Sequence, residues 1–394
     1  NKGYTCSRLD KERYLEGFVY NPNRLKKPLK RKGERGGGQW EEISWDQAFD
    51  EVAAKLAELR DEYGPETLAF TEGTARTWSW LHYKFTNLFG SPNTGGNGTI
   101  CYSSDMWLEP CTYGGFCSDK ADWVNADLVV LWGRNTIASE PLLWHWVDTN
   151  RKERGAKLLV IDPRFSEVAQ QADLFLQLRP GTDAALAMGM LNVMIEEGIY
   201  DKDFVDCWCY GFEELAAAAA AYPVDKVAEI TWIPEEKIVQ AARRFATAER
   251  ACIQWGLAVD MTREALPAIQ AIAALTQITG NIDRPGGMII PPEILFYGGG
   301  FGADLLSDEQ TAKRIGLEKY PLLKFGFATL QPDEMVKQME TGDPYALHGM
   351  WMQTTNPLAC MGADPDRFYN AAKDLDFIVG VDLFMTPTIM ALAD

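Results

Sequence analysis

The sequence lacks two features that define broad classes of protein. It has no uninterrupted apolar run of about 18 residues, the length that a membrane-spanning helix requires. It has no surplus of basic residues either, because 38 Lys and Arg stand against 56 Asp and Glu and give a formal net charge of -18. Nucleic-acid binding depends on a positively charged surface that meets phosphate groups, so the charge argues against that function.

Several short motifs are missing as well. The chain contains neither G-x-G-x-x-G nor G-x-x-x-x-G-K-[ST], so a standard nicotinamide site and a P-loop are both disfavoured. Its eight cysteines form no C-x-x-C pair, and we expect no zinc site or iron–sulfur cluster held wholly within this chain. Cys207, Cys209 and Cys252 stand in the apolar contexts "DCWCY" and "RACIQW" and are expected to be buried.

Segments typical of strands alternate with segments typical of helices along most of the chain. "SWDQAFDEVAAKLAELRDEYG" (44–64) has helical spacing of its apolar residues, an N-cap candidate in Ser44 and a stop at Gly64. "ADLVVLWG" and "KLLVID" are expected strands, and a run that is apolar throughout, such as Leu128 to Leu131, suits a strand covered on both faces. The alternation predicts an α/β fold with parallel sheets and right-handed crossovers.

The residues that follow these two strands indicate a ligand site. In open parallel sheets, ligands bind beyond the carboxyl ends of the strands, where loops lead into helix N-termini. Gly133 allows the backbone to come close to a ligand, and Asn135 offers both a donor and an acceptor. Asp162 stands where dinucleotide-binding folds place the acid that binds a ribose. Arg134 and Arg164 can pair with phosphate oxygens.

The stretch "RPGTDAA" repeats this arrangement. Pro180 and Gly181 form a turn, Thr182 can cap the next helix, and Asp183 faces the same edge. For any one loop, two interpretations stay open: turn residues that only connect elements, or contacts to a nucleotide. Several such loops in succession favour a nucleotide-type ligand.

Ten stretches, taken together and in order, resemble the molybdopterin oxidoreductases of the dimethyl sulfoxide reductase family. They cover nearly the whole chain and read "NKG", "NPNRLKKPLKR", "WEEISWDQAFDEV", "GSPN", "WGRN", "VIDPR", "RPGTDAALAMGMLNVMIEEGIYDKDF", "TGNIDRPGG", "TTNPL" and "VDLFMTPTIMALAD". The resemblance implies two Rossmann-like parallel-sheet domains, one inserted in the other. On this basis we expect an extended N-terminal segment at 1–39, a discontinuous α/β domain at 40–120 and 345–394, and an inserted α/β domain at 121–344.

The resemblance also implies a bis-molybdopterin guanine dinucleotide cofactor that carries Mo or W. Matching the motifs position by position assigns contacts with one dinucleotide to "WGRN", "VIDPR" and "RPGTD", and contacts with the other to "TTNP". The expected cofactor-binding residues are Gly133, Asn135, Asp162, Arg164, Gly181, Asp183, Thr355 and Asn356.

Cys101 is the expected metal ligand. In the family, a Cys, selenocysteine, Ser or Asp follows the "GSPN"-type turn as a helix begins, and Cys101 in "GSPNTGGNGTICYSSDMW" holds that place. A soft thiolate suits a sulfur-coordinated metal, and a helix N-terminus favours the thiolate by lowering the pKa of the thiol. A thiol packed in the core is the alternative for an isolated Cys, and Cys111 and Cys117 are the other candidates for a ligand.

Lys2 in "NKG" is the second residue to which the resemblance gives a catalytic role. Many relatives have a Cys two or three residues before this Lys as the last ligand of a [4Fe–4S] cluster, with the Lys between the cluster and the pterin. The sequence opens without Met or a signal peptide and stops on "TIMALAD", so we expect a fragment of a longer protein. The cluster ligands would then lie outside this chain, and the compartment stays open between a prokaryotic cytoplasm and a Tat-exported periplasm.

The expected function is two-electron oxygen-atom or hydrogen transfer on a small substrate, with electrons passing to an iron–sulfur subunit or domain. Two alternatives stay open: a non-redox hydratase or hydroxyl-transferase of the same family, and a cofactor-free scaffold subunit of a respiratory complex. Within the chain, the aromatic stretch "TARTWSWLHYKF" (74–85) either lines a substrate funnel or packs in the core, and Asp105 is a further candidate for a proton shuttle.

Overall fold

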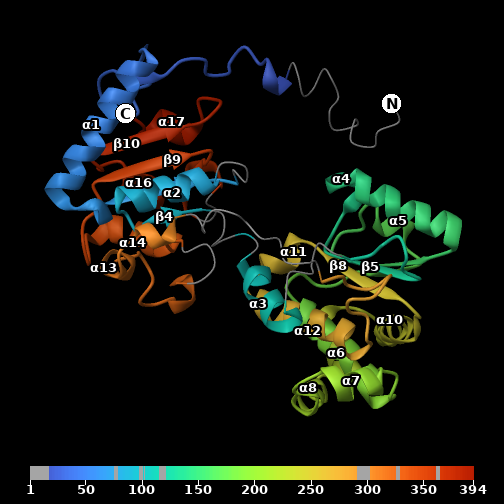
Figure 1. The fold of residues 1–394 in the computed structure, drawn as a ribbon. Helices are drawn as coiled ribbons and strands as arrows, with labels where there is room; N and C mark the ends of the chain where they lie inside the picture. The colour runs from blue at the N-terminus through green and yellow to red at the C-terminus, as the bar shows by residue number, and fades with distance from the viewer. Residues whose placement is uncertain are drawn as a thin grey trace. The chain divides into compact units, whose positions relative to one another are not determined.

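The computed structural model describes residues 17–74, 79–96, 101, 103–114, 121–290, 302–324, 329–360 and 364–394 (Figure 1). The chain divides into two compact units. We call residues 100–294 the middle unit, and residues 9–99 with 295–394 the terminal unit. None of the helices in the described part of the chain has the length and apolar character needed to cross a membrane.

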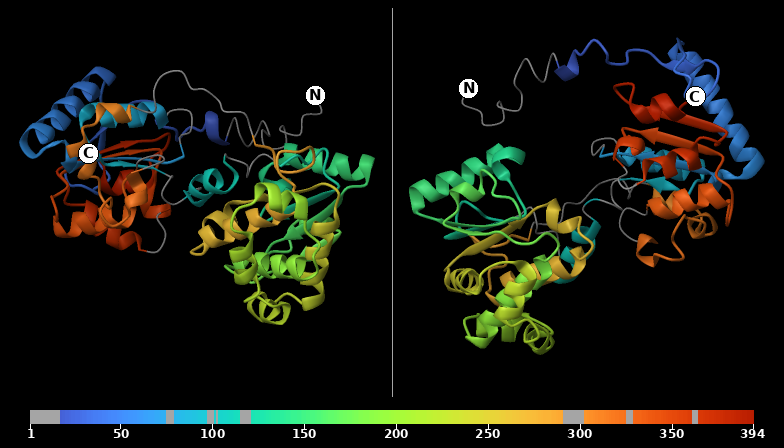
Figure 2. Two further views of the ribbon diagram at one scale, coloured as in Figure 1. Left: turned by 60° about the horizontal axis from the view of Figure 1, so that its bottom comes forward. Right: turned by 180° about the vertical axis from the view of Figure 1, so that it is seen from behind.

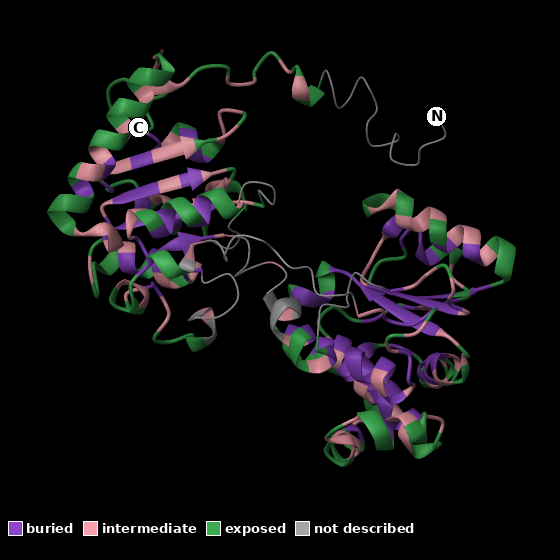
Figure 3. Cartoon of the chain, viewed as in Figure 1, coloured by how far each residue is buried: buried purple, intermediate pink, exposed green. Residues whose placement is uncertain are grey.

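The middle unit is built on a parallel sheet of four strands in the order β7-β6-β5-β8. The strands are β5 (Leu128–Trp132), β6 (Lys157–Ile161), β7 (Leu174–Leu176) and β8 (Ala251–Trp255). Every residue of β5 and β8 is buried, as expected for strands covered by helices on both faces (Figure 3).

Helices cover both faces of this sheet, α5 on one face and α6, α10 and α12 on the other (Figures 1 and 2). Helices α6 and α12 are apolar almost all round and pack against each other, which explains why ten residues of each are buried. The helices are α3 (Ser103–Tyr113), α4 (Thr136–Ser139), α5 (Pro141–Arg154), α6 (Asp183–Glu196), α7 (Lys202–Trp208), α8 (Phe212–Ala219), α9 (Val224–Thr231), α10 (Glu235–Thr247), α11 (Leu257–Asp260) and α12 (Ala265–Ile278), with a 3-10 turn at Ala169–Gln171.

The terminal unit is built on a second parallel sheet, in the order β10-β9-β3-β4. Its strands are β3 (Leu68–Glu72), β4 (Thr94–Gly95), β9 (Gly349–Gln353) and β10 (Phe377–Val381), and a separate antiparallel pair joins β1 (Leu29–Arg31) to β2 (Trp40–Glu42). The helices are α1 (Trp45–Tyr63), α2 (Ser79–Phe89), α13 (Asp308–Ala312), α14 (Pro332–Thr341), α15 (Pro357–Cys360), α16 (Pro365–Ala372) and α17 (Pro387–Leu392), with 3-10 turns at Pro65–Thr67, Ala303–Leu305 and Pro321–Lys324.

The two faces of this second sheet follow from the alternation of side chains along each strand. Leu68 and Phe70 of β3 pack with Leu56 and Leu59 of α1. Ala69, between them in sequence, faces the opposite side and belongs to the cluster that α14, α16 and α17 complete. Helix α1 begins and ends as the sequence predicts, because the Ser44 hydroxyl accepts from the Gln47 backbone N–H and Gly64 follows the last turn with φ +99°.

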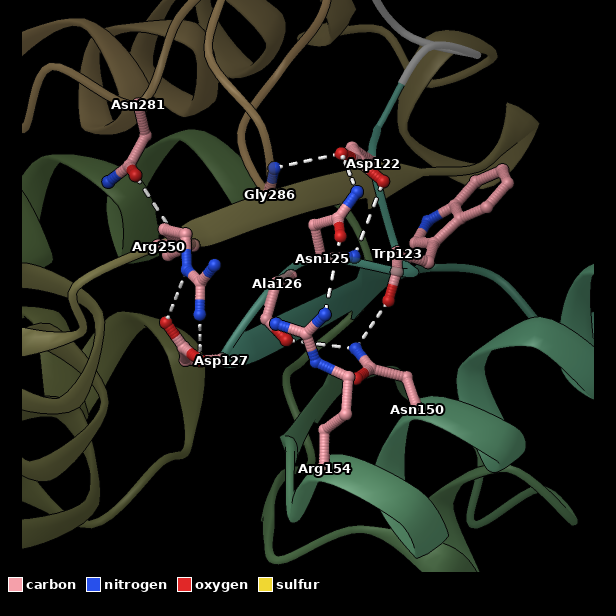
Figure 4. A network of polar contacts seen from close by, with 11 residues as sticks. Asp122, Trp123, Asn125, Ala126, Asp127, Asn150, Arg154, Arg250, Asn281 and Gly286 are labelled. Atoms are coloured by element: carbon pink, nitrogen blue, oxygen red, sulfur yellow. Dashed lines mark hydrogen bonds and ion pairs between the residues drawn. The ribbon is translucent and has the colours of Figure 1, made fainter.

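A polar network fastens the amino ends of β5 and β8 in the middle unit (Figure 4). The Asp122 carboxylate accepts from Asn125 Nδ2 at 2.8 Å and from the Gly286 backbone N–H at 2.9 Å. Arg250 donates two hydrogen bonds of 2.9 Å to Asp127. These contacts hold the amino edge of the sheet in place, and none of them involves a residue at the carboxyl edge.

The structure confirms an α/β fold with parallel sheets, and it differs from the sequence predictions in two details. The compact units do not end where the expected domains end, at residues 120 and 344, because α3 packs against α12 and α14 packs against α16. Cys252 is buried as predicted, but Cys207 is exposed. Helix α7 buries Val205, and a residue two positions later points to the opposite side of a helix.

Candidate functional site

In the middle unit, the order in which the chain adds strands to the sheet switches sides at β5. From β5 the chain continues to β6 and β7 on one side, whereas β8 lies on the other side of β5. In open parallel sheets such a switch point opens a crevice at the carboxyl ends of the strands, and ligands bind there. Gly133 and Gly256 are the residues that follow these two strands.

These two glycines meet more closely than any other residue type would allow. Gly133 has φ +59°, a conformation that residues with a Cβ rarely adopt. A Cβ on Gly256 would lie only 2.4 Å from the carbonyl oxygen of Gly133. The glycines therefore let the loops after β5 and β8 pack backbone against backbone at the switch point.

The next turn of chain leaves polar atoms in need of a partner. Asn135 donates from Nδ2 to Glu167 Oε2 at 2.8 Å. Among the described residues, however, neither Asn135 Oδ1 nor Thr136 Oγ1 has a hydrogen-bond partner, and both atoms are buried. Buried polar atoms are normally satisfied, so these two fit a ligand that carries hydrogen-bonding groups.

Two carboxyl groups stand on the same edge. Asp162 follows β6 and accepts from the Arg164 backbone N–H at 2.7 Å. Asp183 begins α6, is buried, and accepts from Trp132 Nε1 at 2.8 Å. Burial raises the pKa of both carboxyl groups, and the charge of Asp162 adds to the rise at Asp183. The edge thus offers acceptors suited to ribose hydroxyls or base N–H groups.

The raised pKa of Asp183 makes a testable prediction about stability. When a carboxyl pKa is higher in the folded state, the resulting stabilisation is complete below the ordinary pKa of aspartate and is lost as pH rises through the folded value. D183N keeps an oxygen for the Trp132 N–H and removes this loss. Thermal unfolding between about pH 4 and about pH 8 should show a midpoint above that of the wild type at the alkaline end, with the difference shrinking as pH falls.

Asp127 supplies a control with the opposite sign. Its hydrogen bonds from Arg250 lower its pKa, although burial acts in the other direction. D127N should therefore lower the unfolding midpoint at neutral pH and match the wild type more closely at acid pH. A D183N midpoint displaced by the same amount at every pH would contradict this assignment.

The other residues expected on this edge differ in their contacts and in their exposure. Arg134 donates to Glu140 and to the Trp255 carbonyl oxygen at 2.9 Å, so it braces the loops after β5 and β8. Arg164 is largely exposed on the same edge. Gly181 has φ +79°. The Thr182 hydroxyl does not cap α6 as predicted, because it donates to the Arg179 carbonyl oxygen.

The terminal unit has a switch point of its own between β3 and β9. The chain runs from β3 to its neighbour β4, and from β9 to β10 on the opposite side. A Cβ on Gly73 would lie 2.0 Å from the carbonyl oxygen of Thr354, whose own φ is +50°. Thr355 and Asn356 follow directly, and both are half-buried. Asn356 Oδ1 accepts from the Thr388 hydroxyl at 2.6 Å, which ties the start of α15 to α17.

The proposed metal ligand and its alternatives are placed as follows. Cys101 is half-buried, two residues before α3 begins, and Cys111 is exposed on that helix. Lys2 and Cys117 lie outside the described residues, and of Asp105 only the backbone is described. Within the described ranges, no group of three or more His, Cys, Asp and Glu residues could hold a metal ion.

Sequence reasoning missed Gly73, Gly256 and Thr354. A signal was present for Gly256, because β5 and β8 both end in Trp-Gly, in "VVLWG" and "CIQWG". A cavity of about 1190 Å³ was also not foreseen. It lies among α3, α6, α7, α8 and α12, and Cys111, the alternative candidate for the metal ligand, is among its lining residues.

Comparison with known proteins identifies the family. The molybdopterin oxidoreductase family model matches residues 24–394, so the chain belongs to that family. This confirms the resemblance found in the sequence. Membership implies a molybdopterin cofactor with Mo or W, and the buried Asn135 Oδ1 and Thr136 Oγ1, which have no partner among the described residues, fit such a ligand.

The relatives include enzymes of different kinds. The chain is 34% identical to acetylene hydratase of Syntrophotalea acetylenica over 94% of its length and 54% of that protein. It is 30% identical to the thiosulfate reductase molybdopterin-containing subunit PhsA of Salmonella typhimurium, over 94% of this chain and 50% of that one. It is 29% identical to formate dehydrogenase H of Escherichia coli, over 93% of this chain and 53% of that one.

The fold is also similar to that of a solved structure. Acetylene hydratase from Pelobacter acetylenicus superimposes with a TM-score of 0.81 at 32% identity, covering 94% of this chain and 55% of the other. The chain thus spans about half the length of the relatives it matches.

Proposed function

We propose that this chain carries dinucleotide-binding parts of a catalytic subunit with a bis-molybdopterin guanine dinucleotide cofactor. The observation that carries the proposal is that each parallel sheet has a switch point where two backbones meet at a glycine. In this proposal each unit acts as a Rossmann-like domain, with the middle unit inserted in the terminal one. The cofactor supplies the two-electron chemistry, and the protein supplies binding and orientation.

In the middle unit, Gly133 and Gly181 let the backbone approach the dinucleotide, and Asn135 provides a buried acceptor with no partner among the described residues. Asp162 and Asp183 accept hydrogen bonds from ribose or base, and Arg164 pairs with a phosphate oxygen. In the terminal unit, Thr355 and Asn356 contact the other dinucleotide through the loop after β9. Cys101 is the ligand to Mo or W. Lys2, beside a [4Fe–4S] cluster bound outside this chain, helps electrons pass to an iron–sulfur subunit or domain.

Metal and pterin analysis of the full-length protein tests this proposal. We expect Mo or W close to one atom per chain, together with pterin fluorescence after oxidation. A protein without either would instead support a cofactor-free scaffold subunit. Such a scaffold would not need the unpartnered Asn135 oxygen, and this feature favours the cofactor-binding enzyme.

The reaction has two candidates. Oxygen-atom or hydrogen transfer on a small substrate is the first, and the reductase and the dehydrogenase among the relatives support it. Non-redox hydration is the second, because acetylene hydratase matches 94% of the chain in both sequence and fold. Purified full-length protein that hydrates acetylene without an added electron donor or acceptor would favour the second. Turnover that requires one would favour the first.

A further inference from the structure

Glu72 is a buried acid at the switch point of the terminal unit that the assignments above do not use. It is the last residue of β3 and is only 5% exposed. It lies on the same face of the strand as Leu68 and Phe70, because alternate residues point the same way. Its neighbour Gly73 makes the close contact with Thr354, so the carboxyl group sits at the edge where a ligand would bind.

The carboxyl group is only half satisfied. It accepts a hydrogen bond from Ser79, at the start of α2. Its other oxygen, Oε2, is fully buried and has no hydrogen-bond partner among the residues that the structure describes. A buried carboxylate with a bare oxygen costs free energy, whereas a protonated carboxyl group becomes an O–H donor and avoids that cost.

Among the described residues, the groups around Glu72 do not neutralise a negative charge there directly. Tyr83 of α2 faces it, and a Cβ on Gly96 would lie 3.0 Å from the Tyr83 hydroxyl and 3.9 Å from Glu72 Oε1. Burial raises the pKa of Tyr83, and the charge of Glu72 adds to the rise. Arg314 is buried, and its charge acts to lower the pKa of Tyr83. The His82 ring forms a hydrogen bond with the Phe70 carbonyl oxygen and not with Glu72. Burial raises the pKa of Glu72 as well.

We propose that Glu72 is an acid–base residue of this enzyme, holding a proton on its buried carboxyl group and exchanging it with a substrate oxygen bound at the carboxyl edge of β3. The inference rests on the function proposed above. The O–H bond of Glu72 breaks as an O–H bond forms on the substrate, and the resulting carboxylate takes its next proton from water. Reduction of an oxygen-containing substrate requires such a transfer, since the oxygen that leaves takes up protons. In hydration, the O–H bond of Glu72 would instead break as a C–H bond forms on the substrate.

Infrared spectra of the full-length protein report on the proton directly. The wild type at neutral pH should have a carbonyl stretch of a protonated carboxyl group that shifts in D₂O, and E72Q should lack it. Glu66 provides the matched control: although burial acts to raise its pKa, its ion pair with Lys313 at 2.7 Å and its hydrogen bonds lower it. E66Q should keep the band. Its absence from the wild type would overturn the proposal.

Kinetics then test the role of that proton. E72Q should lower kcat by about 100-fold or more while KM and metal content stay within about twofold, because a positioned acid or base contributes on that scale. E72D, one methylene shorter, should recover part of the loss, and E66Q should match the wild type. An E72Q variant with wild-type kcat at every pH would overturn the proposal. A wild type without Mo, W or pterin would instead overturn the proposed function, and the infrared band would still decide whether Glu72 holds a proton.

Discussion

Replacing Cys101 with alanine in the full-length protein is expected to remove nearly all bound Mo or W and to lower kcat by at least about 100-fold. Even residues that only orient a metal ligand change affinity or activity by roughly 10- to 100-fold, and loss of the ligand itself should exceed that. Cys101 is half-buried two residues before α3, a position that suits a thiolate held near a helix N-terminus. Elemental analysis and turnover measure both effects.

The same helix offers a matched control. Cys111 is exposed on α3, so C111A should keep its metal and its activity. C101S should retain part of the metal, because the hydroxyl group keeps an oxygen donor where the thiol stood. Circular dichroism of C101A should match that of the wild type. Wild-type metal content in C101A would eliminate Cys101 as the ligand.

Replacing Gly256 with alanine is expected to destabilise the middle unit by about 3 kcal/mol, at the upper end of what overpacking usually costs. Gly256 has an extended backbone, φ -115° and ψ 171°, that alanine adopts freely. The cost therefore comes from contact alone, since the new Cβ would lie 2.4 Å from the Gly133 carbonyl oxygen. For a unit of this size the unfolding midpoint should fall by roughly 6–12 °C.

Gly181 separates this effect from ordinary glycine replacement. A Cβ there would meet no atom within 4 Å, and only its φ of +79° opposes alanine. G181A should therefore cost about 1–2 kcal/mol. G256A should also lower cofactor content, because the strands must move apart at the switch point. Equal stability of G256A and the wild type would show that the two backbones do not need to meet.

Much of the fold could be predicted because the signals are local. The strands β5 and β6 are almost wholly apolar runs that end in Gly133 and Asp162, and Ser44 and Gly64 bound α1. The α/β class follows from this alternation. The residues on the carboxyl edge of the middle unit could also be predicted. A residue that follows a parallel strand lies at the carboxyl edge of the sheet, whichever strand is next to that strand.

The remainder depends on which strands become neighbours. Gly256 acquires its role only because β8 lies beside β5, and Gly73 acquires its role only because β9 lies beside β3. Helix α2 illustrates the same limit: Tyr83 is buried, whereas Trp80 is 49% exposed. Its aromatic residues thus divide between the core and the surface, a division that its composition does not reveal.

The pairing of β3 with β9 has a consequence for biosynthesis. Thr71 and Trp351, which are joined by a hydrogen bond, lie 280 residues apart in the chain. On the ribosome, β3 emerges long before its central partner, while the intervening middle unit can collapse around its own strands. Until β9 is synthesised, the apolar strand β3 has an unpaired edge. Chaperone dependence or premature aggregation should originate there.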